Sequence, residues 1–295
     1  MLDYNSLGHI LTLANDRDIP VSQLVLEDQA NTLDVSLDEV YKAMSKRLDV
    51  MEASIEGRLK GPFKSPSGLS GGDAYKLNES FKKGNTIGGR LLDKMLIRAL
   101  ACAEGNACMD KIVAAPTAGA CGIIPAVLLT IMEEHKIPRE KIIMGLFTSG
   151  AIGMAIAKRA SISGAEGGCQ AECGSASAMA AGALVEILGG TTDMIGHAAG
   201  IALKGVLGLV CDPVAGLVEV PCIKRNALGA ANALSSANLA LAGIESMIPV
   251  DEIIDAMRQV GDLMTPALKE TSEAGLATTE TAISFTQKLN EKEGS

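Results

Sequence analysis

Residues 167–188 read GGCQAECGSASAMAAGALVEIL, a run built almost entirely from Gly, Ala, Ser and aliphatic side chains. Gly189 and Gly190 follow it directly, and glycine commonly ends a helix. The run therefore predicts a helix over 172–188 that lets neighbouring helices approach its backbone closely. The whole chain shares this preference, since 47% of its residues are hydrophobic but only 2% are aromatic. The sequence predicts an all-α fold whose helices pack through small residues.

Other helices follow from local patterns on both sides of this run. Ser36 and Glu39 have the spacing of a capping box, which predicts a helix that begins there. Further helices are expected over 91–111, 140–160, 191–204, from 226 onward and over 249–270. Nothing in the sequence predicts an extended sheet. We therefore divide the chain into an N-terminal helical segment, residues 1–60, and a single helical domain, residues 61–295, with glycine-rich loops.

Charge and hydrophobicity exclude several classes of protein. The 295 residues carry a formal net charge of −9 and form no basic stripe, so a nucleic-acid partner is not expected. Residues 112–132 lack charged side chains and are long enough to span a bilayer, but Pro116 and Pro125 interrupt them. We interpret this stretch as buried and expect no membrane contact. The N-terminus has no basic and apolar leader pattern, which predicts a cytoplasmic protein.

The seven cysteines suggest a metal centre more than a disulfide framework, because the expected compartment is reducing. Cys169 follows two glycines, and Cys211 and Cys222 each stand near a proline, which predicts stiff, non-helical backbone. Three such thiols could converge on one point. Three thiolates on a [4Fe–4S] cluster leave one iron open to act as a Lewis acid. The alternative is that each cysteine is a small buried core residue, which is common for free cysteine.

Two glycine-rich turns are candidates for anion binding. Residues 61–90 contain SGLSGGD, and residues 116–122 read PTAGACG. In each case small residues precede a predicted helix, whose free N–H groups suit a carboxylate or a phosphate. Neither turn is a P-loop, and each can also be an ordinary turn.

Four motifs resemble the catalytic part of the iron–sulfur L-serine dehydratases, specifically the α chain of the two-chain form. They are SGLSGGDAYKL (67–77), APTAGACGIIPAV (115–127), GCQAECGSASAMAAGA (168–183) and CDPVAGLVEVPCIKRNA (211–227). The resemblance covers roughly residues 60–295. It implies a helical lyase that converts L-serine to pyruvate and ammonia with a [4Fe–4S] cluster and without pyridoxal phosphate. Carried over by motif, the metal ligands are Cys169, Cys211 and Cys222, and Cys173 is left out.

The resemblance also implies partners. One-chain members of the family carry a further domain before the catalytic part. A separate β chain with an ACT-like regulatory module is therefore expected here, in a higher oligomer. Some members place a C-terminal cysteine on the fourth iron, whereas this sequence ends Lys292-Glu293-Gly294-Ser295.

The substrate contacts are predicted from the same motifs. The two turns are expected to hold the carboxylate of L-serine through backbone N–H groups and hydroxyls, and an arginine can bind a carboxylate in a bidentate fork. The predicted substrate-binding residues are Ser67, Ser70, Gly71, Gly72, Thr117, Gly119 and Arg225. The general base is left open among Lys76, His197, Lys224, a cysteine and a residue of the β chain.

Two other functions compete with this interpretation. One is a different iron–sulfur hydro-lyase that dehydrates a small hydroxy acid. The other is a non-catalytic helical subunit in which the cysteines belong to the core.

Overall fold

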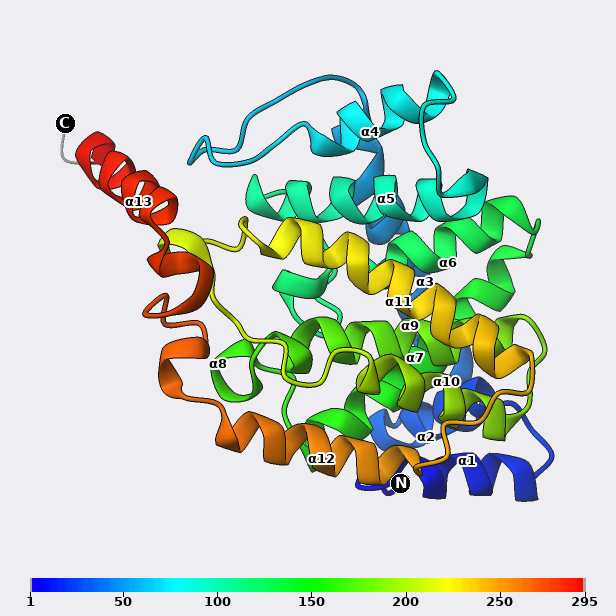
Figure 1. The fold of residues 1–295 in the computed structure, drawn as a ribbon. Coiled ribbons are helices and arrows are strands. Elements are labelled where there is room, and N and C mark those ends of the chain that lie inside the picture. The colour runs from blue at the N-terminus through cyan, green and yellow to red at the C-terminus, as the bar shows by residue number, and fades with distance from the viewer. Residues whose placement is uncertain (1, 294–295) are drawn as a thin grey trace.

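The computed structural model describes residues 2–293, and the prediction of an all-α fold is confirmed (Figure 1). Over these residues no strand is formed, and the one β-bridge joins Cys211 to Lys269. The helices are α1 (Leu7–Asp16), α2 (Val21–Leu33), α3 (Leu37–Glu56), α4 (Asp73–Lys82), α5 (Gly89–Ala107), α6 (Ile123–Glu134), α7 (Arg139–Arg159), α8 (Gly164–Gly167), α9 (Ser175–Ile187), α10 (Thr192–Lys204), α11 (Cys222–Leu241), α12 (Val250–Leu263) and α13 (Glu280–Glu293).

Helix α9 is the centre of the molecule. Every residue of α9 except Glu186 is buried, and helices α6, α7, α10 and α11 pack around it. Small residues make this possible: a Cβ at Gly182 would overlap the Ile152 side chain of α7. The predicted helix over 172–188 is thus correct in place but begins differently. A π-helix, Gln170–Gly174, precedes α9.

The N-terminal segment packs on the helices that follow it. Helix α1 lies against α10, α2 against α7, and α3 against α5. Leu7, Leu24 and Leu48 join the same continuous buried core as α9. The predicted capping box at the start of α3 is confirmed, because Ser36 and Glu39 bond to each other's backbone N–H groups. Residues 1–60 therefore help to bury the helices around α9.

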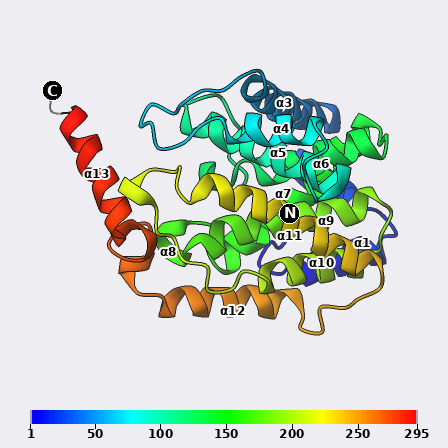
Figure 2. The same cartoon turned by 45° about the horizontal axis from the view of Figure 1, so that its top comes forward.

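Helix α11 runs across one face of the molecule (Figures 1 and 2). The sequence predicts a helix from residue 226, but the helix begins at Cys222. Its small residues face α5, α9 and α10, whereas Leu228 on the opposite face is 67% exposed. From Asn226 to its end α11 carries no charge, and this part combines close packing on one side with an apolar surface on the other.

The C-terminal part wraps around one end of the body. Helix α12 ends at Leu263, earlier than the predicted 270, and an irregular segment leads from there to α13. Helix α13 projects away from the other helices in both views (Figures 1 and 2). The irregular segment passes Cys211, so the chain's C-terminal part reaches the region of the predicted metal ligands.

One described helix, α7, is long and apolar enough to cross a membrane by length and composition alone. Of its most apolar window, 67% is buried inside the protein, as in the core helix of a globular fold. The uncharged stretch 112–132 forms the shorter helix α6 and the turn before it.

Candidate active site

The three predicted metal ligands lie at the ends of different elements. Cys169 precedes the π-helix, Cys211 sits in an extended loop, and Cys222 is the first residue of α11. All three are buried, with exposures of 3%, 3% and 8%. The prediction of non-helical backbone holds for Cys211, whereas Cys222 opens a helix after the cis peptide bond Val220–Pro221. We call these residues the three-cysteine site.

The backbone before Cys169 depends on glycine. Gly168 has φ +76°, a conformation that other residues rarely adopt. A Cβ there would also collide with Met264 and with the carbonyl of Leu209. The amide of Gln170 fixes the other side, because it donates to the Met257 carbonyl and accepts from the N–H of Gly208. The Cys169 thiol is therefore held at a defined place by the chain around it.

Arg225 connects the helix of Cys222 to the loop of Cys211. Its guanidinium donates to the carbonyl of Val210 at 2.9 Å and to the carboxylate of Asp212 at 2.9 Å. These residues flank Cys211 on both sides. The side chain of Arg225 is only 13% exposed, and that of Asp212 is 4% exposed. Arg225, predicted to bind substrate, thus has two of its donors occupied in holding the Cys211 loop.

The thiols of the three-cysteine site influence one another electrostatically, which places them close together. Burial, together with nearby Cys169 and Glu172, raises the pKa of Cys222 to about 12. Burial and the same neighbours raise the pKa of Cys211 as well. The pKa of Cys169 is lowered by its hydrogen bond with Cys173 and by Arg225. Two of the three thiols therefore require a bound cation to become thiolates.

We tested these residues against the implied iron–sulfur cluster. Across residues 2–293, no group of three or more His, Cys, Asp or Glu side chains surrounds one point closely enough to hold a single metal ion. A four-iron cluster is larger than an ion and takes thiolate ligands that stand further apart. Three buried thiols from separate segments are the donor type that such a cluster takes, so the donor set fits it.

Glu172 lies at the same site and was missed by the sequence analysis. It belongs to the π-helix, and burial raises the pKa of its carboxyl. A Cβ placed on Gly164 would lie 2.8 Å from the Glu172 carboxylate and 3.1 Å from the Cys211 sulfur. One signal was present in the sequence: Glu172 is the only charged residue between Gly167 and Val185.

The predicted serine turn binds carboxylates of the chain itself. Ser65 and Ser67 each donate a hydroxyl to Glu219 at 2.7 Å, and Ser70 donates to the same carboxylate. Glu219 is only 6% exposed. The role of Ser67 and Ser70 as substrate contacts remains a prediction, but both hydroxyls have an internal partner.

The start of α4 is occupied in the same way. Gly71 and Gly72 precede the helix with positive φ angles, as an anion-binding turn requires. The N–H groups of Asp73 and Ala74 donate to the buried carboxylate of Glu104, at 2.6 and 3.3 Å. The N–H groups that the sequence analysis assigned to a substrate carboxylate are thus taken by Glu104, and the role of Gly71 and Gly72 in substrate binding stays a prediction.

The second predicted turn lies beside Glu172. Asn226 ties the turn to α11, because its side chain accepts from the N–H of Gly122 at 2.8 Å and donates to the carbonyl of Gly119 at 2.7 Å. A Cβ at Gly119 would lie 3.2 Å from the Glu172 carboxylate. The hydroxyl of Thr117 is buried and has no hydrogen-bond partner of normal geometry among the described residues.

The side chains considered as general bases have other partners. Lys76 and Lys224 are exposed and both pair with Asp73, at 3.1 and 2.9 Å. His197 accepts from the N–H of Ser246 at 3.3 Å. These contacts supply ordinary structural roles for all three.

The other cysteines differ in their surroundings. The sulfur of Cys173 lies 3.4 Å from that of Cys169. Cys102 and Cys121 form a separate buried pair with sulfurs 3.9 Å apart, and Ser54 donates to Cys102. This agrees with a packing role for Cys102 and makes it a suitable control for the three-cysteine site.

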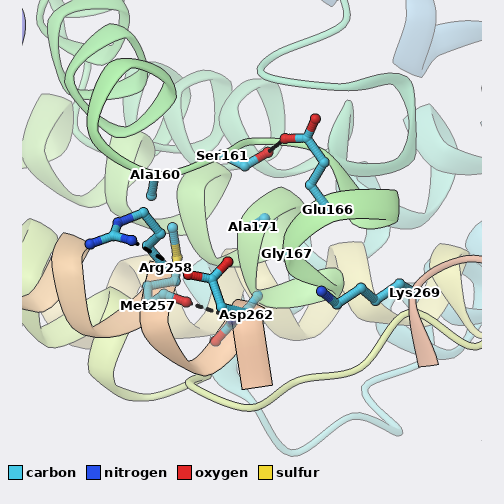
Figure 3. Close-up of a pocket in the computed structure, with 10 residues that line it drawn as sticks. Ala160, Ser161, Glu166, Gly167, Ala171, Met257, Arg258, Asp262 and Lys269 are labelled. Carbon is cyan, nitrogen blue, oxygen red and sulfur yellow. Dashed lines mark hydrogen bonds and ion pairs between the residues drawn. The ribbon is translucent and has the colours of Figure 1, made fainter. Parts of the chain in front are cut away.

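A pocket of about 370 Å³ borders the Cys169 segment (Figure 3). Gly167, Gln170 and Lys269 contribute to its lining. Glu166 also lines it, and its carboxylate accepts from the hydroxyl of Ser161 at 2.6 Å (Figure 3). Glu166 therefore has a partner of its own outside the three-cysteine site, although it lies close to Glu172 in the sequence.

Comparisons with known proteins point to one family. A family model described as the serine dehydratase alpha chain matches residues 16–277. The chain is 45% identical over 286 residues to the probable L-serine dehydratase, alpha chain, of Bacillus subtilis, covering 97% of this chain and 95% of that protein. It is 47% identical over 277 residues to the L-serine dehydratase, alpha chain, of Peptoniphilus asaccharolyticus, covering 94% and 95%. Against the L-serine dehydratase of Streptomyces coelicolor it is 38% identical over 275 residues, covering 91% of this chain but 59% of that protein.

Proposed function

The chain belongs to the serine dehydratase alpha chain family, and we propose that it converts L-serine to pyruvate and ammonia at the three-cysteine site. It is the α chain of an L-serine dehydratase, a lyase. The observation that supports this proposal best is that Cys169, Cys211 and Cys222 are buried, come from three separate segments and influence one another's pKa.

We propose a [4Fe–4S] cluster held by these three cysteines as the cofactor, in place of pyridoxal phosphate. When bound, such a cluster supplies an open iron that can act as a Lewis acid toward the hydroxyl and carboxylate of the substrate. The raised pKa values of Cys211 and Cys222 support this, because a cationic centre is what would keep both sulfurs ionised.

The chain's own residues hold and shape the site. Arg225 fixes the loop of Cys211 from both sides, so the two sulfurs on α11 and the loop keep their relative position. Asn226 holds the turn of Thr117 against the same helix. The unpartnered hydroxyl of Thr117 is available to the carboxylate of L-serine, as the sequence predicted. Preorganised donors of this kind stabilise charge at low cost in reorganisation.

The partner we propose is a β chain with an ACT-like module. This chain matches only 59% of the Streptomyces coelicolor L-serine dehydratase, and the β chain that we propose would supply what the rest of that protein carries. The names of the two α-chain relatives support the same arrangement. We also propose that the enzyme works in the cytoplasm as a higher oligomer.

The first experiment measures iron, acid-labile sulfide and pyruvate formation on anaerobically purified protein, with and without the β chain. We expect about four iron and four sulfide per chain, as the cluster formula requires. Cys211→Ser should lose the cluster and reduce pyruvate formation to background, because a thiolate ligand is removed. The matched control is Cys102→Ser, which lies in the other buried cysteine pair and should keep both. Retained iron and turnover in the Cys211 variant would refute the site assignment.

A further inference from the structure

Glu172 is enclosed by backbone on two sides. Its carboxylate lies against Gly164 of α8 and Gly119 of the Thr117 turn, at distances where any side chain on either glycine would be crowded. Both glycines therefore leave room for one carboxylate between two loops. Among the residues that the structure describes, the side chain of Glu172 has one hydrogen-bonding neighbour, the hydroxyl of Thr117, and that contact is not of normal geometry. A half-buried carboxylate with so weak a partner gains from a ligand that supplies a better one.

Acids of the chain outnumber cations around Glu172. Glu270 interacts with it electrostatically, and Asp212 shares the one nearby cation, Arg225. The cation that acts on Glu172, Arg225, already donates to Val210 and Asp212. The site therefore has more acid than base, and a cationic ligand group would restore the balance.

L-serine brings such a group. Its hydroxyl and carboxylate are the two groups that an open metal would engage, which leaves the α-ammonium without a protein partner. We infer that the carboxylate of Glu172 binds the α-ammonium of the substrate and thereby selects amino acids over hydroxy acids. This inference rests on the proposed function, since it places L-serine at the three-cysteine site.

Ammonium binding by Glu172 can be tested by comparing two ligands that differ in the ammonium group. L-serine and 3-hydroxypropanoate share the hydroxyl and the carboxylate and differ only in the ammonium. An enzyme that binds the ammonium through a buried carboxylate favours the first strongly, because the second leaves that carboxylate unpaired. Without the carboxylate, the discrimination between the two ligands should collapse.

The variant is Glu172→Gln, which keeps the size of the side chain and removes its charge. We expect the KM for L-serine to rise about 10- to 100-fold with kcat within about fivefold of wild type, as loss of ground-state binding requires. The inhibition constant of 3-hydroxypropanoate should stay within about twofold. Stopped-flow measurement of the cluster absorbance after mixing with L-serine reports substrate binding before turnover. It should show the same loss of affinity in the variant relative to the wild type.

The matched control is Glu166→Gln, six residues earlier, whose carboxylate bonds to Ser161 in the neighbouring pocket. It should leave both ligands unaffected. A lower kcat with an unchanged KM in the Glu172 variant would overturn the inference, as would an equal loss of affinity for both ligands.

If Glu172→Gln fails to hold iron, Glu172→Asp carries the test. This variant keeps the negative charge on a side chain that is shorter by one methylene group. The affinity for L-serine should therefore fall, whereas the affinity for 3-hydroxypropanoate should not. Equal changes for both ligands would contradict ammonium binding. These failures differ from a failure of the proposed function, in which the wild-type enzyme itself would hold no iron or form no pyruvate.

Discussion

Two regions of the molecule look alike in sequence and differ in the structure. The serine turn, residues 65–72, and the threonine turn, residues 116–122, both combine small residues with hydroxyls ahead of a helix. In the serine turn, the carboxylate of Glu219 accepts hydrogen bonds from the serine hydroxyls, and the carboxylate of Glu104 accepts from the N–H groups at the start of α4. In the threonine turn, the hydroxyl of Thr117 and the carboxylate of Glu172 lie beside each other, and Thr117 has no hydrogen-bond partner of normal geometry among the described residues.

The difference separates a structural role from a binding role. Buried polar groups are normally paired, and those that stay unpaired mark places where a ligand completes the site. By this criterion the serine turn has a structural role, and the threonine turn is the one that we propose to face the substrate. Glu219 also lies between Cys211 and Cys222 in the sequence, so one short loop connects the serine turn to the proposed metal ligands.

Among the variants that test this difference between the two turns, a replacement of Glu219 should have the largest effect on stability. Glu219→Ala should lower the free energy of unfolding by about 3 kcal/mol, because three buried hydroxyls lose a charged acceptor. Chemical denaturation of the wild-type and variant chains measures this change. Glu219→Gln should recover part of the loss, since its carbonyl oxygen still accepts.

A control is available in the same part of the chain. Glu273 is exposed, and Glu273→Ala should change the free energy of unfolding by less than about 0.5 kcal/mol. A loss below about 1 kcal/mol in Glu219→Ala would show that the hydroxyls do not depend on Glu219. The serine turn would then be free to meet the substrate.

Thr117 should show the opposite behaviour. Thr117→Val removes a buried hydroxyl that has no partner, so stability should be unchanged or higher by up to about 1 kcal/mol. The KM for L-serine should rise severalfold, because the hydroxyl is proposed to contact the carboxylate. Urea denaturation and steady-state kinetics measure the two quantities.

The same replacement at Thr130 is the reference. Its hydroxyl accepts from Arg98 at 2.8 Å, so Thr130→Val should lose about 1–2 kcal/mol of stability. If Thr117→Val also destabilised the chain and left KM unchanged, the threonine turn would be an anchor like the serine turn.

The fold was predictable because packing leaves a strong compositional signal. The small residues of 172–188 indicated a buried helix, and α9 is buried along nearly its whole length. The position of α11 was not predictable, since a helix that carries no charge from Asn226 onward can be central or can expose Leu228 at the surface. Local sequence does not say which neighbours cover a face.

The sequence motifs of the site could be recognised, but the residues that contact them in the fold could not. The three cysteines were proposed from their settings and the family resemblance, and all three are buried, but their role as metal ligands stays a prediction. Glu172 was missed because its two neighbours, Gly119 and Gly164, come from distant segments. The partners of Ser67 and Ser70 were missed for the same reason, since Glu219 lies about 150 positions further along the chain and only folding brings it close.

The smallest effect is expected at Glu104, the other carboxylate of the serine turn. Burial raises the pKa of Glu104 more than the N–H groups of Asp73 and Ala74 lower it. A carboxyl with a raised folded-state pKa favours folding below its unfolded pKa, and this contribution is lost as the pH rises through the folded value. Glu104→Gln has no such titration and keeps a carbonyl acceptor for α4.

The wild-type chain should therefore be favoured over Glu104→Gln more at about pH 4.5 than at about pH 7.5, with a difference near neutral pH below about 1 kcal/mol. Denaturation at the two pH values measures the sign. The reverse sign would mean that the N–H groups of α4 stabilise the ionised carboxylate more than burial opposes it. The start of α4 would then be an anion-binding site that the carboxylate of Glu104 occupies. In this respect the serine turn would resemble the threonine turn, which is proposed to bind the carboxylate of the substrate.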